Sequence, residues 1–178
     1  SGAEWLVRSR LGSEFRHYAP LNLYRRSFIE AHDLRFIPER LHEDVVWTTE
    51  VLLNAQRVMF DATPYYLYRQ LIRRSDPSTT QRRLERIVAS SEANARDLDR
   101  IIGRYRIEGA ARNMLSYQLT DGALSIFHKL SRMPDRNAVG AWRRRLRQDG
   151  LLALLWRHAQ TPAQHRRIAK HWLRSLLG

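Results

Sequence analysis

The residues of this sequence best suited to chemistry are the adjacent His42, Glu43 and Asp44. They open a segment with amphipathic helical spacing, residues 43–55. Two carboxylates at a helix start are ordinary, since the N-terminus stabilises an anion by roughly 0.3–1 kcal/mol. The same carboxylates could also take a proton from an acceptor hydroxyl as a general base. The run alone leaves helix capping and base catalysis open, so the surrounding motifs must decide between them.

Four further short motifs accompany this run in a fixed order. The five are Leu21-Asn22-Leu23-Tyr24-Arg25-Arg26-Ser27-Phe28-Ile29, Leu34-Arg35-Phe36, His42-Glu43-Asp44-Val45, Arg57-Val58 and Pro64-Tyr65-Tyr66-Leu67-Tyr68-Arg69. In order and spacing they resemble the second half of bacterial family 2 glycosyltransferases, enzymes of GT-A type that build cell-surface and extracellular polysaccharides. The resemblance covers about residues 3–80, under half of the chain. One departure follows Arg69, where the family often has Arg-x-Gly-Ser and this chain has Gln70 to Ser75.

The resemblance implies a role for each residue of the site. Asp44 matches the general base of an inverting transfer, in which an acceptor hydroxyl attacks the anomeric carbon as the nucleoside diphosphate leaves. We expect the helix N-terminus to keep Asp44 ionised with a near-normal pKa, and Glu43 to act beside it. His42, Trp47 and Arg69 are the expected substrate-binding residues, with Arg69 directed at the donor diphosphate.

The family's donor-binding half does not appear in this sequence. That half is Rossmann-like and binds the diphosphate through an Asp-x-Asp motif and a divalent cation, Mg or Mn. The literal Asp97-Leu98-Asp99 is not assigned this role, because Leu98 belongs to a helical apolar seam that should turn both aspartates outward. We therefore expect a fragment that is inactive alone and binds no cation. Its full-length parent would use a nucleotide-sugar donor and a glycan or lipid-linked acceptor.

The elements expected to position these residues change in character along the chain. Residues 24–31 and 43–55 have helical spacing, whereas residues 57–60 and 65–68 are β-branched or aromatic and predict two short strands around a turn. From Pro77 onward only helices are indicated. The predicted class is α+β and predominantly helical. Residues 1–80 would form the acceptor-side end of a GT-A-like α/β catalytic domain, and residues 81–178 a helical basic bundle or extension.

The helices of the second part are predicted from their apolar spacing and caps. One seam repeats at alternating steps of four and three: Leu84, Val88, Ser91, Ala95, Leu98, Ile102 and Tyr105. Residues 112–130 supply a partner helix, and a third helix should start at Pro134. A fourth has a capping box in Thr161-Pro162-Ala163-Gln164, with proline at the first helical position.

The net charge of +13 is concentrated late in the chain. Residues 1–80 hold 11 Lys and Arg against 10 Asp and Glu, whereas residues 136–178 hold 10 against the single Asp149. Anionic partners are therefore expected there. Basic and aromatic residues alternate on helical spacing, and those assigned to an anionic membrane surface are Arg143, Arg144, Arg145, Trp156 and Trp172.

Other interpretations of the basic part remain open. It could be a solvated face over a Trp and Leu core, or a helical nucleic-acid-binding module without catalysis. The seam from Leu84 to Tyr105 could instead meet a partner chain in a helical protein-interaction module, and homodimerisation of the fragment could cover apolar surface that the missing donor half leaves exposed. No apolar run reaches the roughly 18 residues of a bilayer span, and the absence of cysteine excludes disulfides and thiolate metal sites. We expect a cytoplasmic protein, peripheral on the inner face of the plasma membrane.

Overall fold

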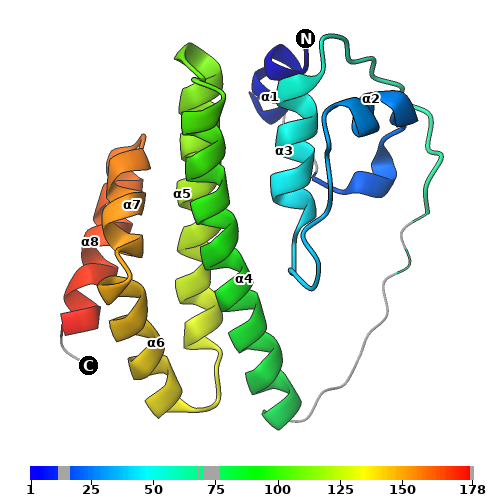
Figure 1. The fold of residues 1–178 in the computed structure, drawn as a ribbon. Coiled ribbons are helices and arrows are strands. Elements are labelled where there is room, and N and C mark those ends of the chain that lie inside the picture. Colours follow the sequence, from blue (N-terminus) through cyan, green and yellow to red (C-terminus); the bar gives the residue numbers. More distant parts are fainter. Residues whose placement is uncertain (12–16, 68, 70–76, 177–178) are drawn as a thin grey trace.

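The computed structural model describes residues 1–11, 17–67, 69 and 77–176 (Figure 1). Every regular element in these ranges is a helix: α1 Gly2–Leu11, η1 Ala19–Leu21, α2 Arg26–Ala31, α3 Asp44–Asn54, α4 Pro77–Arg104, α5 Gly109–Ser131, α6 Arg136–Gln148, α7 Leu151–His158 and α8 Pro162–Leu176. The α+β class predicted from the sequence, with a GT-A-like α/β end, is therefore wrong for the described part of the chain.

The two predicted strands are replaced by irregular chain. Residues 57–60 and 65–67 contain no strand, and Met59 and Leu67 are 90% and 93% exposed. β-branched and aromatic residues favour strands because they pack well on a pleated, half-buried surface. No neighbouring strand exists in the described residues to offer that surface, so the pattern has nothing to pair with.

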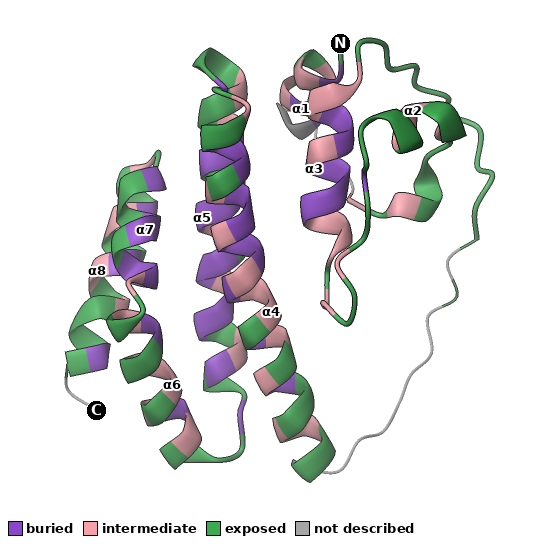
Figure 2. Ribbon diagram, in the orientation of Figure 1, coloured by how far each residue is buried: buried purple, intermediate pink, exposed green. Residues whose placement is uncertain are grey.

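The long helices α4 and α5 form an antiparallel pair through the middle of the molecule (Figure 1). The predicted seam is confirmed along α4, where Leu84, Val88 and Ile102 are buried. The most deeply buried apolar side chains of α5 are Leu115, Leu119, Ile126 and Leu130. Buried positions recur along both α4 and α5 (Figure 2). Burying such side chains stabilises a fold by roughly 1.5–3 kcal/mol each, so this pair organises the core.

Helices α6, α7 and α8 pack on one side of α5. The predicted capping box is confirmed in part: the backbone amide of Gln164 donates to Thr161 Oγ1 at 3.2 Å, whereas Gln164 Oε1 accepts from the backbone amide of Gln160 at 2.8 Å. Helix α6 is capped by Asp135, whose carboxylate accepts from the amides of Asn137 and Ala138. The sequence did not predict the break between α6 and α7, where Gly150 has φ +76, a left-handed conformation that glycine adopts without strain.

Helices α1 and α3 pack on the other side of the α4–α5 pair, α1 on α5 and α3 on α4, and α2 lies beyond α3 (Figure 1). The predicted helix over residues 43–55 is confirmed as α3, and that over residues 24–31 is confirmed in part as α2. The division into domains at residue 80 stays a prediction. In the described part of the chain, none of the helices is long and apolar enough to cross a membrane.

Candidate functional site

The loop before α3 is anchored to the side of α4 by side chains that we call the loop anchor, Ser90, Asn94 and Asp97. The Asn94 Nδ2 donates to the carbonyls of Leu41 at 3.2 Å and His42 at 2.9 Å. Ser90 Oγ accepts from the Leu41 amide at 3.2 Å. The loop's main chain is therefore held by a helix that follows it by about fifty residues of sequence.

Arg40 completes this attachment with its guanidinium group. Its Nη1 donates to Asn94 Oδ1 at 3.0 Å and to Asp97 Oδ2 at 2.8 Å. Both anchor side chains are buried, with Asn94 5% and Asp97 7% exposed. Charge-assisted bonds shielded from water are stronger than exposed ones, so the anchor resists displacement.

The anchored loop has an unusual backbone. Glu39 and His42 both have φ +57, a left-handed conformation uncommon for residues other than glycine. Such a conformation costs of order 1 kcal/mol or more per residue and persists only where surrounding contacts hold it. Here the bonds to the Leu41 and His42 carbonyls supply those contacts, and they fix the direction in which α3 begins.

Asp44 is the first residue of α3 and is partly buried. Burial raises the pKa of its carboxyl, and the neighbouring Glu43 raises it further, while His42 and the backbone amides of Val45 and Asp44 lower it. Loss of water and the adjacent carboxylate therefore outweigh the helix N-terminus in setting the direction of the pKa shift. A carboxylate with a raised pKa is a stronger proton acceptor once ionised.

In the described part of the chain, the carboxylates of Glu43 and Asp44 form no ion pair with Lys or Arg. Glu43 is the N-cap of α3 and makes no side-chain capping bond. His42 is exposed beside them. The arrangement leaves Asp44 able to accept a proton from a bound group.

Tyr24 lies near enough to Asp44 for the two groups to interact electrostatically, which the sequence did not reveal. Burial raises the pKa of Tyr24 to about 12, and the Asp44 charge contributes to that rise. The phenol donates to the Ala19 carbonyl at 3.3 Å. Tyr24 belongs to the first of the five sequence motifs, so the fold brings that motif to the start of α3.

Trp47, predicted to bind substrate, is buried in a small aromatic cluster. Its ring stacks on Phe36 at 4.4 Å and meets the edge of Tyr24 at 4.8 Å between ring centroids. The indole Nε1 has no hydrogen-bond partner among the described residues. These contacts give Trp47 a packing role, and its predicted contact with substrate stays a prediction.

Arg69, the other predicted substrate-binding residue, is exposed. Within the described ranges it forms no ion pair with Asp44 or Glu43 and so is not joined to the site. The departure from the family pattern at residues 70–75 lies outside the described residues.

The Asp97-Leu98-Asp99 triplet is engaged inside the protein. Asp97 pairs with Arg40, and Asp99 pairs with Arg157 at 3.0 Å and His158 at 2.7 Å. The expectation that both aspartates face outward is wrong for Asp97, since the loop covers a second face of α4 that the seam does not include. In the described part of the chain, no cluster of three or more His, Asp or Glu residues is arranged to hold a metal ion.

A line of hydrogen bonds from the buried Ser116 through the buried His158 to the partly exposed Asp99 joins three helices. His158 Nδ1 lies 3.0 Å from Ser116 Oγ, and His158 Nε2 lies 2.7 Å from Asp99 Oδ1. The residue types are those of a serine hydrolase, but Ser116 is 3% and His158 4% exposed. A hydroxyl enclosed in a helical core cannot reach a substrate carbonyl, so the line links α4, α5 and α7 structurally.

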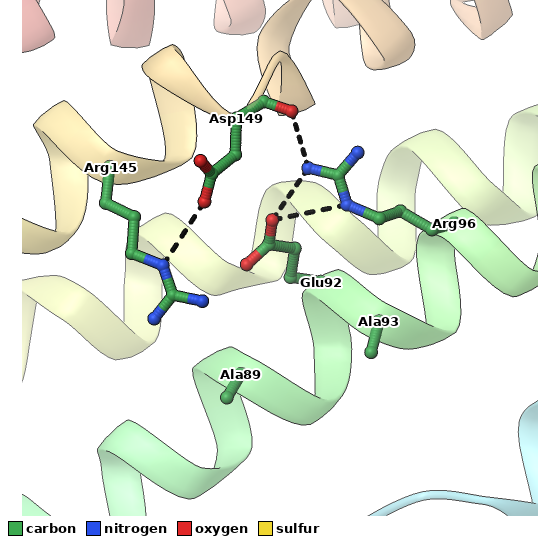
Figure 3. Close-up of a pocket in the computed structure, with 6 residues that line it drawn as sticks. All are labelled: Ala89, Glu92, Ala93, Arg96, Arg145 and Asp149. Atoms are coloured by element: carbon green, nitrogen blue, oxygen red, sulfur yellow. Dashed lines mark hydrogen bonds and ion pairs between the residues drawn. The ribbon is translucent and has the colours of Figure 1, made fainter.

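A shallow pocket of about 440 Å³ lies between α4 and the turn joining α6 to α7 (Figure 3). Arg96 bonds Glu92 and the Asp149 carbonyl across it, and Arg145 pairs with the Asp149 carboxylate at 3.2 Å. The charges in this pocket therefore satisfy one another. Arg145 is one of the residues predicted to face a membrane, and its guanidinium group pairs with Asp149 at this pocket.

The other residues predicted to face a membrane lie on α6, α7 and α8. Arg144 is exposed and Arg143 is partly buried. Trp156 and Trp172 are 47% and 39% exposed, although both are large apolar side chains.

His171 in α8 makes the stability of this region dependent on pH. It stacks on Phe127 at 3.9 Å, and burial together with Arg174, Arg143, Lys170 and Arg167 lowers its pKa from 6.5 to about 4. The unfolded chain therefore binds a proton at His171 more readily than the folded chain does. The contribution of neutral His171 to the free energy of unfolding is fully present above the unfolded pKa and is lost as pH falls from 6.5 towards 4.

We expect acidification from about pH 7 to about pH 5 to cost about 1 kcal/mol of unfolding free energy through His171, after allowance for solvent screening. Urea unfolding of the wild type and of His171→Phe, which keeps the stacking, measures this across the range. The variant should show a flatter dependence on pH, and equal slopes for the two proteins would exclude His171 as the cause.

Comparison with known proteins gives a partial similarity to a glycosyltransferase. Over 68 residues the chain is 32% identical to the "Uncharacterized glycosyltransferase YibD" of Escherichia coli (strain K12). The aligned part is 38% of this chain and 20% of that protein, so the chain spans about a fifth of the relative's length. No protein family and no solved structure matches the chain. The similarity supports a relation to a glycosyltransferase and extends no further.

Proposed function

We propose that this chain is the acceptor-side part of a nucleotide-sugar-dependent glycosyltransferase of family 2, acting in surface polysaccharide or glycolipid synthesis. The observation that carries the proposal is the 32% identity over 68 residues to a protein named a glycosyltransferase. The partly buried carboxylate of Asp44, which no described Lys or Arg pairs with, supports it because it supplies the group that such a transfer needs. The helical residues described here would be joined, in the full-length enzyme, to a donor-binding part.

In the proposed reaction Asp44 is the general base. Its carboxylate takes the proton of the acceptor hydroxyl while the hydroxyl oxygen forms a bond to the anomeric carbon of the donor sugar. The bond from that carbon to the diphosphate breaks, and the nucleoside diphosphate leaves with the electron pair. Attack from the face opposite the leaving group inverts the anomeric configuration.

The neighbouring residues have supporting roles in this proposal. Glu43 helps to raise the pKa of Asp44 and so strengthens the base. His42 is exposed next to it and is offered as an acceptor-binding residue. The loop anchor would act as a positioning device, since it fixes the loop that delivers Asp44.

A divalent cation, Mg or Mn, would neutralise the leaving diphosphate in such an enzyme. The described residues do not fit it: Asp97 and Asp99 are paired with Arg40, Arg157 and His158. We assign no step of the reaction to a cation held by this chain.

Exposed apolar residues on the N-terminal part support the idea of a missing partner surface. Leu23, Met59, Phe60 and Leu67 are 100%, 90%, 59% and 93% exposed. Large apolar side chains that remain this exposed are available for contact with another part of a protein. We propose that the donor-binding part of the enzyme packs here.

The test is a transfer assay on the full-length enzyme, with a panel of nucleotide sugars and lipid-linked acceptors, run as a function of pH. Asp44 acts only when ionised, so activity should fall as pH drops through a pKa that lies above the ordinary value of 3.8. Glu43→Gln removes a charge that raises this pKa, so its acid limb should move to lower pH.

Glu30→Gln, an exposed carboxylate on α2, is the matched control and should leave the profile unchanged. Absence of transfer with every donor would overturn the proposed function. If the enzyme transfers sugar but Glu43→Gln does not shift the acid limb of its pH profile, the proposed activity stands. The acid limb is then not the ionisation of Asp44.

A further inference from the structure

Helix α8 has three distinct faces. Gln164, Ile168 and Ser175 are buried against the bundle and share one side of the helix, because residues three, four and seven apart align. His171 lies on the same side and stacks on Phe127 of α5. This face accounts for the attachment of α8 to the rest of the protein.

A second face of α8 is apolar and exposed. Trp172, Leu173 and Leu176 are 39%, 62% and 57% exposed. Trp156 of α7 is 47% exposed, and its ring contacts that of His165 with 4.6 Å between centroids. It therefore extends this apolar face at the start of α8. We call Trp156, Trp172, Leu173 and Leu176 the apolar stripe.

The third face is basic. Arg166, Lys170 and Arg174 recur every four residues and are all exposed, and we call them the basic row. Among the described residues none of the three forms an ion pair with a carboxylate. Neighbouring Arg167 differs, since it pairs with Asp121 at 2.8 Å.

From this arrangement we propose that α8 docks the protein on an anionic lipid bilayer, lying parallel to its surface with the apolar stripe inserted and the basic row among the headgroups. Tryptophan and leucine beside Arg and Lys on one exposed helix are typical of interfacial helices. Their cations are attracted by acidic headgroups.

Charge complementarity distinguishes this occupant from the others. Residues 136–178 carry ten Lys and Arg against one acidic residue, so two copies meeting through α8 would bring like charges together. A nucleic acid would satisfy the basic row but would leave the leucines of the apolar stripe in water. An acidic bilayer satisfies both faces at once.

The experiment is flotation of the 178-residue chain with phosphatidylcholine vesicles, with and without phosphatidylglycerol. We expect binding to the acidic vesicles only. Arg166→Gln/Lys170→Gln/Arg174→Gln should weaken it by about a hundredfold, since each cation near an acidic surface contributes about 1 kcal/mol. The stripe variant Trp172→Ser/Leu173→Ser/Leu176→Ser should weaken it by about tenfold or more.

The matched control is Arg82→Gln/Arg83→Gln/Arg86→Gln, which removes the same charge from exposed positions of α4 and should bind as the wild type does. Circular dichroism checks that each variant remains folded, and Arg166→Lys/Arg174→Lys should retain binding. Equal weakening by the α4 triple would overturn the proposal, because binding would then follow net charge alone.

Three other results would also overturn it: equal binding to neutral vesicles, binding to duplex nucleic acid without binding to vesicles, or a dimer that the stripe variant converts to monomer. The vesicle assay involves no sugar transfer. Its outcome is therefore independent of whether the proposed function is correct.

Discussion

The Asp44→Asn variant of the full-length enzyme is expected to transfer sugar about 10²- to 10⁴-fold more slowly than the wild type. Asparagine has nearly the same size as aspartate and can still accept the backbone amides at the start of α3, so the loop and helix should be retained. It cannot take the proton of the acceptor hydroxyl. The loss should therefore appear in the rate of transfer, measured under saturating donor.

Binding of the nucleotide-sugar donor should change little in this variant, because Asp44 is assigned to the acceptor side. Titration calorimetry with the intact donor measures it. Asp61→Asn is the matched control, since Asp61 is an exposed carboxylate that bonds only Thr63 and Tyr65 within its own turn. Wild-type activity in the Asp44 variant would remove Asp44 from the mechanism.

The second large effect concerns stability. Replacing His158 with leucine should lower the free energy of unfolding by about 2–3 kcal/mol, because both of its ring nitrogens are engaged and the side chain is 4% exposed. Leucine would leave the Ser116 hydroxyl buried without its partner and would deprive Asp99 of one of its two cationic or hydrogen-bonding neighbours.

Urea denaturation followed by circular dichroism measures this loss. His128→Leu on α5 is the control, since His128 is exposed and its replacement should change stability by less than about 0.5 kcal/mol. Ser116→Ala, which removes only the weaker end of the line, should cost about 1 kcal/mol. A His158 variant as stable as the His128 variant would show that the line contributes nothing.

The helices after residue 77 were largely predictable because their signals are local. The alternating steps from Leu84 to Ile102 and the Thr161 capping box specify a helix from neighbouring residues alone. The strands at residues 57–60 and 65–67 were mispredicted for the opposite reason, since a strand depends on a partner that its own residues do not supply. The break at Gly150 was missed because the apolar run on its far side continues the helical pattern.

The residues of the candidate site could be predicted from the sequence, but the contacts that position them could not. His42, Glu43 and Asp44 are recognisable as a run, but the polar side chains that hold the loop lie on a helix much later in the chain. In the sequence Asn94 and Ser90 look like ordinary polar residues of a helix, and nothing in their spacing indicates that a loop covers them. The raised pKa of Asp44 likewise depends on burial, which the sequence pattern does not give.

The anchoring of this loop by α4 has a consequence for synthesis of the protein. The bonds from Ser90, Asn94 and Asp97 join residues 49 to 57 positions apart, so none can form until α4 has left the ribosome. At ordinary translation speeds that delay is roughly 3–10 s. During this delay the left-handed residues Glu39 and His42 lack the hydrogen bonds that hold the loop. The loop before α3 therefore stays unformed in the nascent chain until α4 has been synthesised.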